Sequence, residues 1–318
     1  MNASIQALEQ RHVRRSLVSD RAFVLFIYLA TLLFVATVLG LFAMLLLGSW
    51  TSIREFGFSF LWTSEWNPIT GRFGALPMIY GTVVSSLTAL VLAGIVGVFG
   101  AAYLADFAPR FISVPLSFLI ELLAAVPSVV FGLWGLFVLA PVLRTVVDPF
   151  LQAHFGMVPL FSGPIFGSSL FTAGILLAIM IIPTISAISR DVIAAVIPEH
   201  REGSLALGVT RWETMWHVLL PGARSGIFGA CILALGRAFG ETIATTMVIG
   251  NKPAIAASLF APSYTLASVV ANEFTEATTD MYLSALIELG LLLFVVSMIV
   301  NAAARVLTWT LLRPSKGR

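Results

Sequence analysis

Long apolar runs constrain the fold of this chain more than any other feature of its sequence. Six of them can be read from the sequence: Ala22–Leu47, Ile79–Leu104, Val114–Ala140, Ser169–Ser189, Ser225–Gly250 and Met281–Ala304. Each is at least as long as the roughly 20 residues that a helix needs to cross a bilayer. A helix satisfies its own backbone hydrogen bonds in hydrocarbon, and an open sheet does not. We therefore predict an all-α polytopic membrane protein with six transmembrane helices.

The composition excludes a water-soluble protein. Hydrophobic residues make up 58% of the 318 positions and charged residues only 11%, against about 25% charged in soluble domains. The net charge of +2 is too small to indicate a nucleic-acid partner. The first apolar run is longer than the core of a signal peptide, so we expect an uncleaved first span.

The distribution of Lys and Arg predicts the orientation. Most of the 18 basic residues lie in the N-terminal segment, in the loop around Arg110, in the loop 191–224 or in the C-terminal tail. Basic loops stay on the cytoplasmic side, so both termini are expected inside. The predicted organisation is a cytoplasmic segment 1–21, a transmembrane domain 22–312 with a cytoplasmic loop 191–224, and a cytoplasmic tail 313–318.

Ionisable residues inside the predicted spans are candidates for function. These are Glu121, Arg237, Glu241 and Glu288, and a charge at the bilayer centre costs about 2.5–3.5 kcal/mol. Arg237 and Glu241 are four residues apart, so one continuous helix places them on the same face. The pair either neutralises itself or forms a polar station on a solute path, where Arg fits an oxyanion and Thr242 adds a hydroxyl.

Prolines and aromatic residues mark other parts of the chain. Pro127 and Pro183 each remove a backbone donor within a predicted span, which kinks the helix, widens a path or serves packing alone. The aromatic stretch 49–78 is either an interfacial piece or a contact for an external partner. The stretch Pro141–Gly167 is predicted to form a compact outer loop.

The loop 191–224 is too long for a simple connection. Its apolar residues follow helical spacing with Gly208 interrupting them, which predicts a short helix, a glycine turn and a second helix. Alone, this pattern fits a surface hairpin as well as a docking site. The chain has no phosphate-binding loop, metal-ligand cluster or nucleophile–base motif, so we expect no enzyme, no metal and no cofactor here. Any ATPase would be another chain.

Part of this loop resembles the EAA loop of ABC-importer permeases. The resemblance lies in Glu202-Gly203-Ser204, in Gly208 and in Leu219-Leu220-Pro221. Gly203 and Ser204 depart from the family, which usually has two alanines there. The resemblance implies that the loop couples to an ATPase, and the residues it assigns to this contact are Glu202, Leu205, Leu207, Gly208, Thr210 and Arg211.

Two further stretches resemble the permeases of phosphate (Pst) importers, and the second is similar to the PstC type rather than the PstA type. They are Gly236–Asn251 and Glu121–Gly135. The resemblance implies a type I permease fold in the bacterial cytoplasmic (inner) membrane and phosphate as substrate. It implies a PstA-like permease, an ATPase dimer that binds ATP and Mg, and an extracytoplasmic phosphate-binding protein as partners. Arg237, Glu241 and Glu121 match charged positions of that family.

Phosphate chemistry suggests a role for the two charges. Phosphate carries a proton near pH 7 and sulfate does not, so Glu241 is expected to accept a hydrogen bond from the P–OH while Arg237 holds the oxyanion. Alternatively, all selectivity resides in the binding protein. Other interpretations are a PstA-like subunit, a permease for another oxyanion, a stand-alone channel or carrier, and a membrane scaffold or sensor.

Overall fold

The structure is a computed structural model that describes residues 2–311, and helices dominate it. The described residues form no β-strand, only isolated bridges between Asn67 and Arg72 and between Gly250 and Ser263. Six helical segments are long and apolar enough to cross a membrane, which confirms the prediction of six spans. They are Phe23–Gly48, Leu76–Phe107, Ser128–Phe155, Leu170–Ala194, Arg211–Gly240 and Asp280–Ala303. The predicted tail 313–318 lies outside the described residues.

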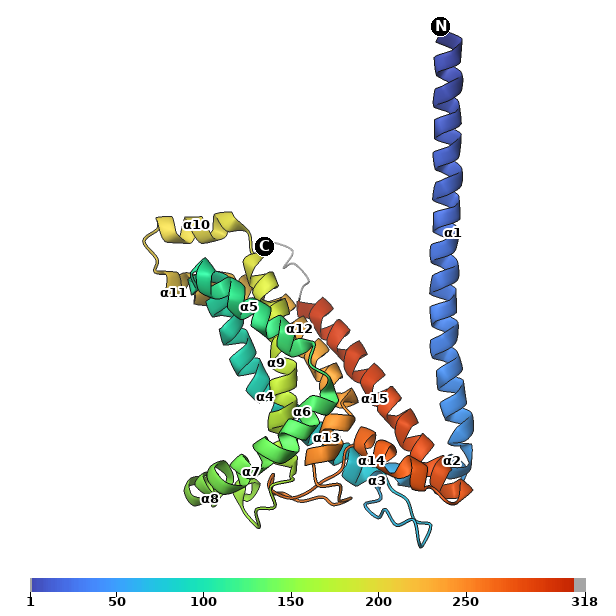
Figure 1. Cartoon of the computed structure of the whole chain (residues 1–318), viewed down its shortest axis with the longest axis vertical. Helices are drawn as coiled ribbons and strands as arrows, with labels where there is room; N and C mark the ends of the chain where they lie inside the picture. Colours follow the sequence, from blue (N-terminus) through green and yellow to red (C-terminus); the bar gives the residue numbers. More distant parts are fainter. Residues whose placement is uncertain (1, 312–318) are drawn as a thin grey trace.

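The first helix stands apart from the others. Helix α1 (Asn2–Gly48) meets α15 (Asp280–Leu311) at one end and diverges from it along most of its length (Figure 1). Near the junction, Phe42 packs against Phe294 with ring centroids 5.8 Å apart, and the Ser284 hydroxyl donates to the Gly48 carbonyl at 2.9 Å. None of the most apolar part of α1 is buried.

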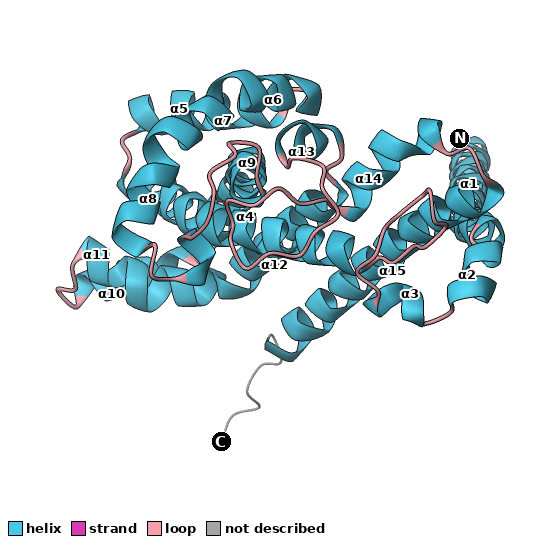
Figure 2. Ribbon diagram, turned by 90° about the horizontal axis from the view of Figure 1, so that it is seen from below, coloured by secondary structure: helices cyan, strands magenta, loops and turns pink. Residues whose placement is uncertain are grey.

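The centre of the molecule is a closely packed group of three helices, α4 (Leu76–Ala102), α9 (Leu170–Ala194) and α12 (Leu220–Gly240) (Figure 2). Small residues allow the close approach. A Cβ at Gly97 of α4 would lie 2.9 Å from Ile185 of α9, and one at Gly226 of α12 would lie 2.3 Å from Val192. Pro183 is buried inside α9, which continues through it to Ala194.

The third predicted span, Val114–Ala140, is wrong in its boundaries. Helix α5 (Arg110–Ala124) ends, and a new helical run starts at Ser128 with Pro127 as its N-cap. The prediction that Pro127 lies within a continuous span is wrong, because the chain turns here and the Leu123 carbonyl accepts from the Val126 N–H at 3.3 Å. Proline disfavours helical geometry in the residue before it, which accounts for the break.

The predicted outer loop 141–167 is largely helical. The run that begins at Ser128 continues to Phe155 because its prolines stand at the starts of helical pieces, where a missing N–H does no harm. In this run the π-helical segments η2 and η3 connect three α-helical pieces. In chain order, the run consists of α6 (Ser128–Trp134), η2 (Gly135–Leu139), α7 (Ala140–Val142), η3 (Leu143–Val147) and α8 (Asp148–Phe155), and the 3₁₀ turn η4 (Pro159–Phe161) follows it.

The fifth predicted span, Ser225–Gly250, is also interrupted. It begins earlier, with α11 (Arg211–Thr214) and the π-helical η5 (Met215–Leu219) leading into α12. It stops at Gly240, because Glu241 adopts an extended conformation with φ −70° and ψ 121°. A short helix α13 (Ile243–Val248) resumes after Thr242.

The aromatic stretch 49–78 forms much of the core at the end of the molecule opposite α10 (Pro198–Ala206). Phe60, Trp66 and Phe73 are buried against Tyr264 and Tyr282, so neither the interfacial piece nor the partner contact expected from the sequence accounts for these three rings. Phe58 and Trp62 nevertheless remain 86% and 75% exposed. The helical pieces at this end are α2 (Trp50–Phe56), α3 (Ser59–Trp62), α14 (Leu266–Glu273) and the 3₁₀ turn η6 (Phe274–Glu276).

Candidate functional site

Arg237 lies near the middle of the helical core. Its neighbours Ala234 and Ala238 on α12 are buried against Ala93 of α4 and Ile181 of α9, which are close to the midpoints of those helices. The Arg237 side chain itself is exposed on the surface of this chain. Since an isolated charge at this depth is costly, its position requires an anionic partner or a water-filled path.

Glu241 and Thr242 form the break between α12 and α13. The Glu241 carboxylate accepts from the Ala244 N–H at 3.4 Å, and the Thr242 hydroxyl donates to the Gly240 carbonyl at 3.1 Å. The prediction that one continuous helix places Arg237 and Glu241 on the same face is wrong, because α12 ends at Gly240 and Glu241 is extended. No Arg237–Glu241 ion pair occurs in the described residues, so mutual neutralisation does not explain the two charges.

The two helix breaks lie near each other. Gly132 of α6 packs directly on α13, where an added Cβ would lie 3.1 Å from Ala244 Cα. Gly132 follows Pro127 by five residues and Ala244 follows Glu241 by three, so both breaks are within two helical turns of this contact. Irregular backbone at membrane depth is tolerated where it is covered by protein or lines a water-filled cavity.

Glu121 does not join this site through an ion pair with Arg237. Its carboxylate lies 3.6 Å from the Arg190 guanidinium at the α10 side of α9, and its side chain is 60% exposed. Arg190 also contacts its neighbour Asp191 at 3.0 Å. Glu288 is buried on α15. The four predicted intramembrane charges therefore occupy different environments.

The predicted helix–turn–helix of the loop 191–224 is present. Helix α10 is followed by a turn in which Gly208 has φ +83°, a conformation that glycine adopts without strain. Thr210 and Glu213 then form a capping box at the start of α11. The hydroxyls of Ser204 and Thr214 lie 3.0 Å apart and join the two helices.

The residues assigned to coupling fall into two groups. Leu207 is 84% exposed, and Gly208, Thr210 and Arg211 are exposed with it at the tip of the hairpin. Glu202 and Leu205 instead line a cavity of about 200 Å³ beneath α10. The tip presents a free surface, and the inner face of α10 rests on the membrane-spanning core.

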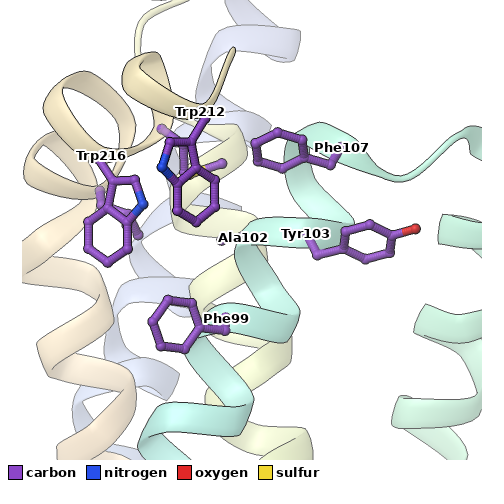
Figure 3. A pocket seen from close by; sticks show the side chains of 8 residues that line it. Phe99, Ala102, Tyr103, Phe107, Trp212 and Trp216 are labelled. Atoms are coloured by element: carbon purple, nitrogen blue, oxygen red, sulfur yellow. The ribbon is translucent and has the colours of Figure 1, made fainter. Parts of the chain in front are cut away.

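Sequence reasoning missed several residues near this hairpin. Asp106, in the π-helical segment η1 (Tyr103–Phe107) that ends α4, is only 3% exposed and forms an ion pair with Arg201 of α10. A groove of about 230 Å³ lies on another side of η1 (Figure 3), and it is lined by Phe99, Ala102, Tyr103, Phe107, Trp212, Met215, Trp216 and Leu220. The helical spacing of Arg201 and Leu205 predicts that they share one face of α10. No pattern in the sequence predicts that Arg201 pairs with Asp106.

A second missed residue lies at the opposite end of the molecule. Asp148 begins α8 and is completely buried, and neither of its carboxylate oxygens has a hydrogen-bond partner among the described residues. The sequence does not single out Asp148, because it lies in the stretch Pro141–Gly167 that is predicted to be a loop.

The fold and these sites define the class of protein, a membrane-embedded permease component. The family model of binding-protein-dependent transport system inner membrane components matches residues 97–309. In an inward-facing structure of the MetNI methionine ABC transporter, a chain that is 15% identical superposes with a TM-score of 0.54. The match covers 74% of this chain and 94% of that one, and at this identity it shows that the two share the ABC importer permease fold.

Closer relatives specify the family. The phosphate transport system permease protein PstC of Mesorhizobium japonicum is 43% identical over 95% of this chain and 94% of its own length. The PstC protein of Pasteurella multocida is 46% identical over 83% of each chain, and a PstC protein of Xylella fastidiosa is 44% identical over 85% of this chain and 84% of its own. The chain belongs to the PstC family of multi-pass membrane permeases.

Proposed function

We propose that this chain is a transmembrane permease subunit of an ATP-driven phosphate importer. The observation that carries the proposal is Arg237, an exposed guanidinium at the middle of the helical core beside a break in α12. A planar fork of donors at that depth suits a tetrahedral oxyanion. The kinship with the PstC proteins supports phosphate as that oxyanion.

Three kinds of partner complete the importer. Helix α1 has no buried residues in its most apolar part, and we assign this surface to a second, PstA-like permease that closes the path. The exposed tip at Leu207–Arg211 is the surface for an ATPase dimer, which binds ATP and Mg. An extracytoplasmic phosphate-binding protein delivers the substrate at the opposite side. ATP and Mg bind to the ATPase, and we assign no cofactor to this chain.

The mechanism is alternating access in the bacterial cytoplasmic membrane, with both termini in the cytoplasm. ATP binding closes the ATPase dimer and displaces the hairpin α10–α11. This motion shifts the equilibrium between outward-open and inward-open arrangements only because the ATPase binds the two arrangements differently. Phosphate enters from its binding protein, contacts Arg237, Glu241 and Thr242 at the break, and leaves on the cytoplasmic side.

The proposal is tested by uptake of labelled phosphate into proteoliposomes. They contain this chain with its partner permease and ATPase, with ATP inside and the binding protein and excess sulfate outside. We expect uptake that requires ATP and ignores sulfate. Uptake abolished by sulfate would indicate another oxyanion, and uptake that persists without the ATPase would indicate a stand-alone carrier. ATP hydrolysis without phosphate flux would contradict the proposed substrate.

We further propose that Glu241 contributes selectivity for protonated phosphate. Its carboxylate is an acceptor for the P–OH group, and it repels fully ionised sulfate. In Glu241→Gln we expect the preference for phosphate over sulfate to fall about tenfold, because one charged hydrogen bond is replaced by an amide. The measurement is competition by sulfate in the same proteoliposomes.

Glu276→Gln is the matched control, since Glu276 is exposed in η6 at the outer end of the molecule. It is expected to leave both uptake and sulfate exclusion unchanged. If Glu241→Gln also leaves both unchanged, selectivity does not depend on this carboxylate and resides in the binding protein.

A further inference from the structure

The π-helical segment η1 (Tyr103–Phe107) is contacted from two sides by the hairpin of α10 and α11, which we call the coupling hairpin. On one side, the buried Asp106 pairs with Arg201, whose side chain is 38% exposed and projects from the inner face of α10. On the other side, the ring of Phe107 packs against Trp212 of α11 with centroids 6.3 Å apart. The five residues of η1 therefore contact both helices of the hairpin.

The aromatic side of this contact extends into the span below. Trp212 meets Trp216 edge-on at 5.7 Å, and Trp216 meets Phe99 of α4 at 6.0 Å. Figure 3 shows these rings around the apolar groove, with the tryptophans on one wall and Phe99 and Phe107 on the other. The contacts across this groove are apolar, and apolar packing is not directional. They therefore do not fix the direction in which one helix moves the other.

The ion pair supplies the directional contact between α10 and the core. Asp106–Arg201 is the ion pair that joins α10 to a membrane-spanning segment in the described part of the chain. It lines the cavity of about 200 Å³ beneath α10, whose other walls are formed by residues such as Ile193 and Leu219. The pair resists displacement because separating it would leave the buried Asp106 carboxylate without a partner.

Segment η1 is linked to both helices that lead toward the membrane interior. It ends α4 without a break in the helical run, and the Ser113 hydroxyl at the start of α5 donates to the Leu104 carbonyl at 3.0 Å. Helix α5 ends next to the break at Pro127. Single π-helical turns often occur at functional sites because their backbone hydrogen bonds are shifted out of the α-helical register.

We propose that Asp106 and Arg201 are positioning residues that transmit the motion of the coupling helix α10 to α4 and α5 through η1. Arg201 moves with α10, Asp106 moves with η1, and their pairing keeps the two in register through the transport cycle. This inference rests on the proposed function, because it requires that α10 docks on an ATPase.

The test measures transport and ATP hydrolysis separately in the assembled importer in proteoliposomes. The variants are Asp106→Asn, Arg201→Gln and the charge-reversed double variant Asp106→Arg with Arg201→Asp. The cavity beside the pair leaves room for the longer side chain at position 106. Arg224→Gln is the matched control, since Arg224 is an exposed arginine at the start of α12.

Each single variant is expected to keep hydrolysing ATP while the phosphate transported per ATP falls about tenfold, a usual size for coupling between sites. The reversed pair is expected to restore that ratio to within about threefold of the unaltered complex, which a merely structural role of either residue does not predict. Arg224→Gln should transport normally.

Two results overturn the proposal. One is a normal transport-to-ATP ratio in both single variants. The other is a reversed pair that assembles but transports no better than the single variants. If a single variant fails to assemble, the reversed pair still decides, because recovery of assembly and coupling together requires direct pairing. Absence of ATP-driven phosphate uptake in the unaltered complex instead contradicts the proposed function, so the two failures are distinguishable.

Discussion

Replacing Arg237 by Gln is expected to lower phosphate uptake about hundredfold, the equivalent of close to 3 kcal/mol. The guanidinium is exposed beside the break at Glu241 and lies level with the middle of α4 and α9. Each hydrogen bond to a charged group contributes about 1.5–3 kcal/mol, and an arginine makes two such bonds to one oxyanion. Gln retains the aliphatic stem and a polar end group, but it is shorter than Arg and carries no charge.

The expected loss concerns transport and not the ATPase. Hydrolysis of ATP by the assembled complex is expected to fall much less than phosphate uptake, because Arg237 lies in the helical core and the surface proposed for the ATPase is the exposed tip of the hairpin at Leu207. The measurement is phosphate uptake and phosphate release from ATP in parallel samples of the same proteoliposomes.

Arg224→Gln provides the matched control on the same helix. Arg224 is exposed near the start of α12, thirteen residues before Arg237, and its loss is expected to change uptake by less than about twofold, as for most surface charges. Normal uptake by Arg237→Gln would show that the translocated anion does not contact this guanidinium. Equal losses in both variants would indicate a general effect of charge on the complex.

The spans were predictable because the bilayer imposes a simple rule on the sequence. A helix that crosses hydrocarbon must be long and apolar, and each of the six runs in the sequence corresponds to one of the six segments in the structure. The breaks at Pro127 and Glu241 were not predictable from the length and hydropathy of the runs. Hydropathy does not change across Gly240-Glu241-Thr242 enough to end a helix, and backbone geometry decides there instead.

Contacts between distant residues set the limit of sequence reasoning at the hairpin α10–α11. Its helices and its glycine turn follow from local spacing and from the conformational freedom of Gly208. The pairing of Asp106 with Arg201 joins residues 95 positions apart, and hydropathy places Asp106 merely at the end of a span. Only the packing of α10 on η1 shows that this carboxylate is buried.

The aromatic stretch 49–78 presents the same difficulty at the end of the molecule opposite α10. Its sequence favours an interfacial piece and also fits a partner contact, because both require exposed aromatic rings. The structure separates the rings instead. Phe73 stacks on Tyr282 and meets Trp66 edge-on in the core, and Phe58 and Trp62 stay exposed. The Glu273 carboxylate accepts hydrogen bonds from two of the buried residues, Trp66 and Tyr282.

Replacing Glu273 by Ala is expected to lower the free energy of unfolding by about 2–4 kcal/mol, because two hydrogen bonds to a charged acceptor are lost at once. Its carboxylate accepts from the Trp66 indole N–H at 2.8 Å and from the Tyr282 hydroxyl at 2.6 Å. Those donors come from the stretch after α3 and from the start of α15, so Glu273 on α14 joins three separate parts of the chain. The measurement is reversible unfolding of the purified chain in mixed micelles.

Two further variants separate this network from a general effect of charge. Glu276→Ala removes an exposed carboxylate three residues away and is expected to change stability by less than about 0.5 kcal/mol. Tyr282→Phe removes one of the two donors and should cost about 1–2 kcal/mol, less than Glu273→Ala. Equal stability of Glu273→Ala and Glu276→Ala would show that the aromatic core holds the stretch 49–78 without the carboxylate. In that case shape alone, through the packing of Trp66 and Phe73 on Tyr282, accounts for the position of the stretch.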